Sequence, residues 1–313
     1  MELIRGIRNI KARHYGCALS IGNFDGVHLG HQQVIKCLVE QARQRSLPAV
    51  VMIFEPQPLE VFAKHQAPAR ISRFRDKYQQ LKALGVDRLL VVRFSHAFAQ
   101  QSADYFIRHL LVELLGVKYL AVGDDFHFGK GREGNFALLQ AAKAEFGFEL
   151  TASDSFCMNQ QRVSSTLLRQ YLAESDFNSV AQLLGRRFSF NGKVIHGQKL
   201  GRQLGFATAN LKVARHVCPI HGVFAVKAYI EHQPEHRFSG IANIGWRPTA
   251  AGKDLLVEAH LFEFDAALYG QRLVVEPQLK IRDEQKFDSL EALKTQVDLD
   301  IKRAKAYYGL AES

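Results

Sequence analysis

Long apolar runs and paired cysteines are both missing from this sequence, and each absence excludes a class of protein. No stretch of the 313 residues approaches the ~18 consecutive apolar residues of a membrane-spanning helix. The N-terminus also lacks the apolar stretch and small-residue cleavage site of a signal peptide. The four cysteines are scattered without a CxxC pair, which is typical of reduced thiols: Cys17, Cys37, Cys157 and Cys218. We therefore expect a cytoplasmic protein that does not associate with membranes.

Positive charge is in excess but is not concentrated. The formal net charge is +10 at pH 7 and the isoelectric point is about 9.5. No block of five consecutive Lys or Arg residues occurs. Such a chain can bind nucleic acid, handle polyphosphates, or simply have a basic surface, and composition alone leaves these three possibilities open.

The first half of the sequence alternates between apolar runs and amphipathic segments. The apolar runs predict strands at residues 18–24, 48–56, 87–94, 118–126 and 148–156. Segments with helical periodicity lie between them, at residues 31–46, 74–85, 103–116 and 135–147. This alternation predicts βαβ units and a parallel, Rossmann-like sheet in an α/β domain that covers residues 1–184. Ligands of such sheets bind at the carboxyl ends of the strands.

The second half has shorter, β-rich segments separated by Gly, Pro and polar turns. They lie at residues 188–197, 222–232, 238–246, 255–264 and 272–281. This spacing is typical of an antiparallel barrel or sandwich, and we predict a β-barrel domain over residues 185–313. A terminal helix follows, with Asp288 at the N-cap and Glu291 at N3. Its apolar stripe consists of Phe287, Leu290, Leu293, Val297, Ile301 and Tyr308.

The first motif is "GNFDGVHLGH", residues 22–31, where the first predicted strand gives way to a helix. A helix N-terminus offers free N–H groups and a partial positive charge, so it attracts phosphate. Gly22 and Gly26 allow a ligand to approach the backbone. His28 and His31 are able to donate hydrogen bonds to a phosphate and to stabilise the charge that develops when pyrophosphate leaves.

Other interpretations of the two histidines remain open from the residues alone. A single His at a helix start is usually structural or solvated. A pair three residues apart can bind a metal, but no third ligand lies at a recognisable spacing. The string is not a P-loop, because GxxxxGK[ST] is absent.

Further motifs of the sequence support a functional interpretation of the two histidines. HxGH after a first strand resembles the signature of nucleotidyltransferases, and "IGNFDGVHLGHQ" resembles bacterial FMN adenylyltransferases more narrowly. "FEPQPLEVF", "GDDFHFGKGREGN" and "VSSTLLRQYL" follow in that family's order, so the resemblance covers most of residues 18–185. It implies adenylyl transfer with His28 and His31 as catalytic residues. It also implies ATP contacts at Gly22, Asn23 and Asp25.

The later strings imply further contacts. Ser164, Ser165 and Thr166 precede a helix that carries Arg169, and such groups at a helix start suit the β- and γ-phosphates of ATP. Asp125 is implied as a flavin contact. This sequence departs from the family at Gln57, where His is usual, and at Leu168, where Ile is common.

The second motif is "GKVIHGQKLGRQLGFATANL", residues 192–211. Its glycines, with Lys199 and Arg202, predict a phosphate-binding loop, and the oxygens of Thr208 and Asn210 are suitable ligands for Mg²⁺ bound to ATP. A glycine-rich hairpin with surface hydroxyls is the plain alternative.

This string resembles the riboflavin kinase signature, as do "GIANIGWRPT", "VEAHLFEF", "LYGQRLVVE" and "KIRDEQKF". The resemblance implies Glu258 as the catalytic base and Thr208 and Asn210 as Mg²⁺ ligands. It also implies Gly201 and Arg202 as ATP contacts, and Arg282 over the flavin or its new phosphate. Ala207 replaces the family's Pro, which would fix φ before Thr208. We therefore expect a looser loop and a weaker affinity for the metal.

The whole chain resembles the bacterial bifunctional riboflavin kinases/FMN adenylyltransferases. The family's reactions imply riboflavin, FMN, FAD and ATP as ligands, ATP as co-substrate and Mg²⁺ as cofactor, without nucleic acid or membrane partners. One rival is another nucleotidyltransferase with an appended barrel, such as a cytidylyltransferase, which would not explain "GFATAN" and "VEAH". The other is a nucleic-acid-binding protein, which the net charge allows. The sequence leaves the oligomeric state open.

Overall fold

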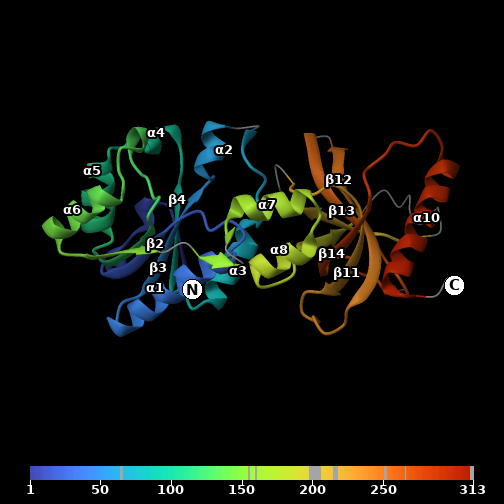
Figure 1. Ribbon diagram of the computed structural model, residues 1–313, viewed down its shortest axis with the longest axis horizontal. Helices are drawn as coiled ribbons and strands as arrows, with labels where there is room; N and C mark the ends of the chain where they lie inside the picture. Colours follow the sequence, from blue (N-terminus) through green and yellow to red (C-terminus); the bar gives the residue numbers. More distant parts are fainter. Residues whose placement is uncertain are drawn as a thin grey trace. The chain divides into compact units, whose positions relative to one another are not determined.

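A six-stranded parallel sheet forms the centre of the N-terminal half of the computed structural model (Figure 1). Its spatial order is β1-β4-β3-β2-β5-β6, and every pairing is parallel. The strands are β1 (Glu2–Arg5), β2 (Cys17–Ile21), β3 (Ala49–Glu55), β4 (Arg88–Arg93), β5 (Val117–Gly123) and β6 (Glu149–Ser153). The predicted parallel α/β sheet is confirmed, with the short β1 as an additional edge strand.

The structure describes residues 1–63, 66–153, 156–158, 161–196, 206–213, 218–249, 252–264 and 266–310. Contacts divide the chain into two units. Unit 1 comprises residues 1–68 and 72–165, and unit 2 comprises residues 69–71 and 166–313.

Helices cover both faces of the sheet, because its strands are apolar on both sides. Cys17, Leu19 and Ile21 of β2 belong to one core, and Ala18 between them belongs to another. The first core is closed by the π-helical segment η4 (Phe106–Leu114) and α6 (Phe136–Phe146), and the second by α1 (Leu29–Gln44) and α3 (Phe74–Ala83). Burial on both faces explains the continuous apolar runs that predicted these strands.

Shorter elements connect the strands of unit 1. They are η1 (Ile7–Asn9), η2 (Ala12–His14), α2 (Pro58–Phe62), α4 (His96–Ala99), α5 (Ala103–Tyr105), η5 (Lys130–Arg132), β7 (Cys157–Met158) and β8 (Gln161–Arg162). Two helices, α7 (Ser165–Ala173) and α8 (Phe177–Leu184), precede the barrel along the chain.

Antiparallel strands close into a barrel in unit 2, in the order β10-β13-β12-β11-β14-β9. They are β9 (Phe190–Ile195), β10 (Ala209–Val213), β11 (Gly222–Ile230), β12 (Phe238–Thr249), β13 (Gly252–Leu261) and β14 (Arg272–Arg282). The ring of Phe177 on α8 lies edge-on to the buried ring of Phe224, with centroids 5.8 Å apart. The predicted barrel is confirmed, and α8 packs against it.

The terminal helix α10 (Leu290–Tyr308) lies along the outside of the barrel (Figure 1). Ala304 is buried there, and Ile301 and Tyr308 pack against the same cluster, whereas Leu290 is exposed. The helix is capped by Ser289, whose Oγ accepts a hydrogen bond from the Ala292 amide at 3.1 Å. The predicted cap at Asp288 was wrong by one residue, because Asp and Ser cap equally well and the sequence does not separate neighbours.

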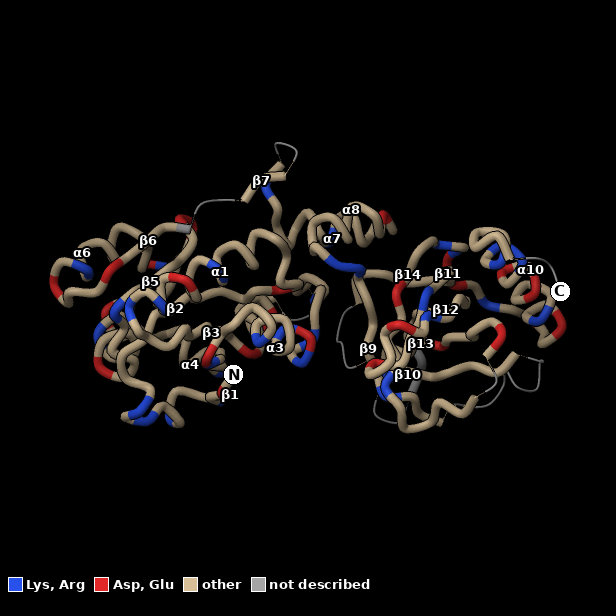
Figure 2. The backbone as a smooth tube through the Cα atoms, turned by 90° about the horizontal axis from the view of Figure 1, so that it is seen from below, with Lys and Arg blue, Asp and Glu red and all other residues tan. Residues whose placement is uncertain are grey.

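Basic and acidic residues are interspersed along both units over the described part of the chain (Figure 2). Among the described helices, none is long and apolar enough to cross a membrane.

A buried ion pair fixes α10 to the last barrel strand. Arg282 Nε and Nη2 each lie 2.8 Å from Asp300 Oδ2, and Gln296 Nε2 donates to Asp300 Oδ1 at 2.9 Å. Asp300 is 1% exposed. A carboxylate at this depth is stable because its oxygens accept these charged and amide hydrogen bonds.

Removal of this carboxylate should destabilise the barrel. In Asp300→Ala, Arg282 keeps its charge but loses its partner, and breaking a buried pair in this way costs about 3–5 kcal/mol. Asp298→Ala, at an exposed position of the same helix, should change stability by less than about 0.5 kcal/mol. Urea unfolding followed by Trp246, the chain's single tryptophan, reports on β12 of the barrel. Equal unfolding midpoints for the two variants would show that the ion pair does not anchor the helix.

Candidate active sites

The first motif forms the turn between β2 and α1, at the carboxyl edge of the sheet. His28 is the N-cap of α1: its Nδ1 accepts a hydrogen bond from the His31 amide at 3.2 Å. His28 is 5% exposed. Because Nδ1 is the acceptor, the neutral ring carries its hydrogen on Nε2.

The two predicted catalytic histidines lie together. Their rings are stacked, with centroids 3.6 Å apart and planes inclined by 17°, and Phe24 lies edge-on to His31 at 5.2 Å. His31 Nδ1 is buried without a hydrogen bond. Burial lowers the pKa of His31 well below its usual range, and the neighbouring His28 and Lys77 lower it further. His31 is therefore neutral at physiological pH.

The buried side chain of Asp25 stabilises the turn between β2 and α1 through hydrogen bonds. Its Oδ1 accepts hydrogen bonds from the Ser72 amide at 3.1 Å and the Ser72 hydroxyl at 3.4 Å, and the same hydroxyl accepts from the Gly26 amide at 3.0 Å. Asp25 is buried, whereas Asn23 is exposed and Gly22 is half-buried. The structure thus places Asp25 as an anchor of the turn, with Gly22 and Asn23 on its accessible side.

The Ser-Ser-Thr motif meets the same turn. Ser165 begins α7, and its Oγ donates to the Asp25 carbonyl oxygen at 3.0 Å. Ser164 is half-buried and Thr166 is exposed. Arg169 Nε, in unit 2, donates to the Ala69 carbonyl oxygen at 2.7 Å.

The two departures from the family pattern have local explanations. Leu168 is fully buried, so the exchange of Ile for Leu is a packing change. Gln57 is the N-cap of α2: its backbone carbonyl accepts from the Glu60 amide at 2.9 Å, and the Glu60 carboxylate accepts from the Gln57 amide at 2.8 Å. The Gln57 Nε2 atom is buried without a hydrogen bond.

Two aromatic clusters at the carboxyl edge escaped the sequence analysis. The first follows β3 and β4 and contains Phe54, Phe62, Phe94, His96 and Phe98, with ring centroids 5.6 to 6.0 Å apart. Phe62 is 58% exposed, and His96 is exposed as well. The second follows β5. Single phenylalanines do not stand out in a chain with 22 of them, so only the shared sheet edge reveals the clusters.

In the second cluster, Phe126 and Phe128 stack at 5.5 Å and Phe106 lies 4.9 Å from Phe128. The adjacent Asp125 is 67% exposed in its side chain, and its Oδ2 accepts from Arg162 Nη2 at 3.1 Å. The predicted flavin contact therefore lies beside aromatic rings.

In the barrel, strand register brings the predicted metal ligand and base together. Glu258 of β13 is directly opposite Asn210 of β10 on one side and Asn243 of β12 on the other. Directly opposite residues have Cβ atoms about 4.5–5.5 Å apart on the same face. Asn243 Nδ2 lies 3.4 Å from Glu258 Oε2 and 3.5 Å from Glu284 Oε1. The sequence analysis did not single out Asn243 or Glu284.

The Ala207–Thr208 segment is tied to the same strand. His260 shares the face of Glu258, and its Nδ1 donates to the Ala207 carbonyl oxygen at 2.9 Å. Thr208 is half-buried, and Asn210 Nδ2 lies 3.4 Å from its carbonyl oxygen. Gly201 and Arg202 lie outside the described residues.

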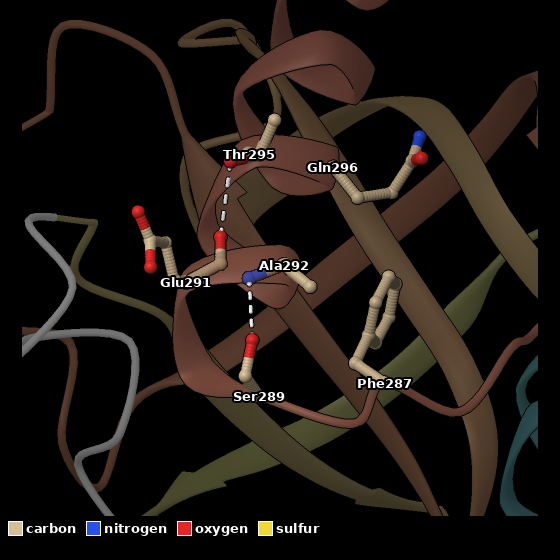
Figure 3. Close-up of a pocket in the computed structure, with 6 residues that line it drawn as sticks. All are labelled: Phe287, Ser289, Glu291, Ala292, Thr295 and Gln296. Carbon is tan, nitrogen blue, oxygen red and sulfur yellow. Dashed lines mark hydrogen bonds between the residues drawn. The ribbon is translucent and has the colours of Figure 1, made fainter.

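A cavity of about 550 Å³ adjoins the start of α10 (Figure 3). Its lining is Phe287, Ser289, Glu291, Ala292, Thr295 and Gln296. Figure 3 shows the Phe287 ring and the Gln296 side chain on the same side of the helix. The Arg282 guanidinium lies 5.7 Å from the Phe287 ring centroid, so the ion pair with Asp300 also supports this wall.

Metal ligands of the His, Cys, Asp and Glu types do not gather in threes anywhere in the described residues. The oxygens of Thr208, Asn210 and Glu258 are a donor set that fits a hard cation such as Mg²⁺, which usually keeps several waters and the phosphates of its substrate.

Two sequence families match the chain. FAD synthetase matches residues 10–167, and riboflavin kinase matches residues 184–308. The bifunctional riboflavin kinase/FMN adenylyltransferase of Escherichia coli (strain K12) is 49% identical over 313 residues, covering 100% of this chain and 99% of that protein. The enzyme of the same name from Haemophilus influenzae is 49% identical over 308 residues, covering 98% and 99% of the two chains.

A solved structure extends the similarity to three dimensions. The crystal structure titled as a macrolide-efflux protein from Streptococcus pneumoniae has a TM-score of 0.76 and 27% identity, and covers 96% of this chain and 97% of that one. Both halves of the chain therefore match, in one order and at full length, and the resemblance noted in the sequence is confirmed. The chain belongs to the family of bifunctional riboflavin kinases/FMN adenylyltransferases.

Proposed function

We propose that this chain phosphorylates riboflavin with ATP to FMN in unit 2 and adenylylates FMN with a second ATP, giving FAD and pyrophosphate, in unit 1. The observation that carries the proposal is that the two family matches cover the two halves and each half brings its own motif residues together. The alternative of another nucleotidyltransferase with an appended barrel does not explain the riboflavin kinase match over residues 184–308.

In adenylyl transfer, a phosphate oxygen of FMN attacks the α-phosphorus of ATP and pyrophosphate leaves. The head of α1 presents free backbone N–H groups to the triphosphate. His28 Nε2–H donates to the oxygens on which charge develops, because its Nδ1 is already engaged by the His31 amide. His31 is neutral and stacked on His28, so it orients that ring and supplies a second N–H.

Residues of the turn between β2 and α1 support this centre. Gly22 and Asn23 offer the accessible backbone of the turn, and Asp25 holds its shape through Ser72. Ser165 joins the start of α7 to the turn. Ser164, Thr166 and Arg169 remain predicted contacts of the β- and γ-phosphates.

In the kinase site, Glu258 accepts the proton of the riboflavin 5′-hydroxyl as that oxygen attacks the γ-phosphorus. Asn243 orients the Glu258 carboxylate from the neighbouring strand. Thr208 and Asn210 would hold Mg²⁺, which neutralises phosphate charge when bound. His260 fixes the backbone before Thr208 at the position where Ala replaces Pro. Gly201 and Arg202 remain predicted contacts of ATP.

Flat aromatic surfaces in each unit suit the isoalloxazine ring. In unit 1, the exposed ring of Phe62 and the rings beside Asp125 offer stacking at the sheet edge. In unit 2, the cavity beside Phe287 falls within the size range of ligand pockets, with Arg282 supporting its wall. The prediction that Arg282 itself contacts the flavin stays a prediction.

The boundary near residue 184 is also part of the proposal. Because Phe177 covers Phe224, a kinase fragment that starts at residue 166 keeps this contact, whereas one that starts at 185 exposes it. A cytoplasmic location fits the free thiols at Cys17, Cys37, Cys157 and Cys218. The absence of nucleic acid and membrane partners stays a prediction.

The purified chain, incubated with riboflavin, ATP and Mg²⁺, should produce FMN first and then FAD. Chromatographic separation of the flavins measures both products in one sample. Formation of neither product would refute the proposal. FMN without FAD would leave only the kinase. Salt-sensitive duplex binding in place of flavin turnover would favour the nucleic-acid alternative.

Substitutions in the two sites should have reciprocal effects. His28→Ala removes a preorganised donor and should lower FAD formation from supplied FMN by about 10²-fold or more, with FMN formation unchanged. Glu258→Gln keeps the size of the side chain but cannot accept the proton. It should lower FMN formation by about 10²–10⁴-fold, with FAD formation from supplied FMN unchanged.

Each variant thus serves as the folding control of the other. If His28→Ala leaves adenylyl transfer intact, the imidazole is only a helix cap. If Glu258→Gln keeps near-normal kinase turnover, the carboxylate positions the substrate and is not the base.

A further inference from the structure

A fully buried lysine lies beneath the first site and has no role in the mechanism described so far. Lys77, on α3, is 1% exposed. It shares the inward face of the helix with Leu81, four residues on, and that face packs against the sheet. Burial of an ammonium group is costly unless it is paired, and an apolar residue of similar volume would fill the space more cheaply.

The ammonium group contacts the turn that carries the histidines. Lys77 Nζ donates to the Asn23 carbonyl oxygen at 2.5 Å. The next residue, Phe24, has φ of 46°, and Val27 has φ of 44°. Both are non-glycine residues in the left-handed region, so this turn needs contacts from the surrounding structure to keep its shape.

The lysine also acts on His31 through its charge. Burial is the main cause of the lowered pKa of His31, followed by His28 and then Lys77. The ring of Phe24, which lies edge-on to the His31 ring, is uncharged. A positive charge at this place adds to the effect of burial on His31 and attracts the triphosphate to the same turn.

We propose that Lys77 is a positioning residue for adenylyl transfer, whose buried ammonium group holds the Asn23–His31 turn in the shape that receives the triphosphate of ATP. This inference rests on the proposed function of unit 1. Lys77 acts through the turn and through His31, without contact to the reacting atoms.

The test uses the full-length chain with Lys77→Met, Lys77→Arg and, as matched control, Lys82→Met at an exposed position of the same helix. Lys77→Met should lower kcat/KM for ATP in adenylyl transfer by about 10²-fold, on the scale of losing one preorganised group. Riboflavin phosphorylation in the same samples should be unchanged. Lys77→Arg keeps the charge and should recover much of the loss, and Lys82→Met should behave like the unsubstituted chain.

Titration of the His31 ring protons by NMR separates a charge effect from simple packing. Removal of the positive charge favours protonation, so the pKa of His31 should rise in Lys77→Met and stay in place in Lys82→Met. If Lys77→Met does not fold, Lys77→Gln replaces it as the neutral variant.

Normal ATP kinetics in a folded neutral variant would overturn the proposal. Equal losses in the Met and Arg variants with an unmoved His31 titration would overturn it too, because packing alone would then explain the residue. If the unsubstituted chain itself makes no FAD, the proposed function fails. Calorimetric binding of a non-hydrolysable ATP analogue to the unsubstituted and neutral-variant chains then still decides the role of Lys77.

Discussion

The unit 1 site depends on one constraint, the turn by which the chain leaves β2 and enters α1. All five positions of β2 are buried, and the turn that follows the strand buries two further apolar side chains, Phe24 and Val27. Both of these residues have left-handed backbone. Such conformations persist only where the surroundings determine them, here through Ser72 on Asp25 and Ser165 on the Asp25 carbonyl.

The two units bring their polar groups together by different physical means. In unit 1, a helix terminus supplies backbone N–H groups, and the N-cap residue His28 accepts the His31 amide through Nδ1. In unit 2, strand register places Asn210, Glu258 and Asn243 side by side. The helix terminus of unit 1 suits the binding of the triphosphate and the departure of pyrophosphate. The strand register of unit 2 fixes a carboxylate beside hard oxygen ligands for the attack of a hydroxyl.

Much of this arrangement could be predicted from the sequence, because periodicity is set locally. Runs apolar on both faces predicted the parallel sheet, and short β-rich segments predicted the barrel. Motif order predicted that His28 lies with His31 and that Asn210 and Glu258 belong to one site.

What could not be predicted depends on contacts between distant segments. Asp288 and Ser289 are both good capping residues, and the helix begins after Ser289 because Ser289 has the extended backbone of an N-cap. Lys77 resembles any helical lysine until its helix docks on the sheet. The pairing of Arg282 with Asp300 and the gathering of Phe54, Phe62 and Phe94 require the fold itself.

The central claim is that one chain performs two different reactions on ATP, with attack at the γ-phosphorus in the barrel and at the α-phosphorus at the head of α1. Parallel reactions of riboflavin with ATP labelled in either the α- or the γ-phosphate test it most directly. The account predicts FAD with one label from each position, the γ-label in its FMN half and the α-label in its AMP half. FAD that lacks the label in either of the two reactions would contradict it.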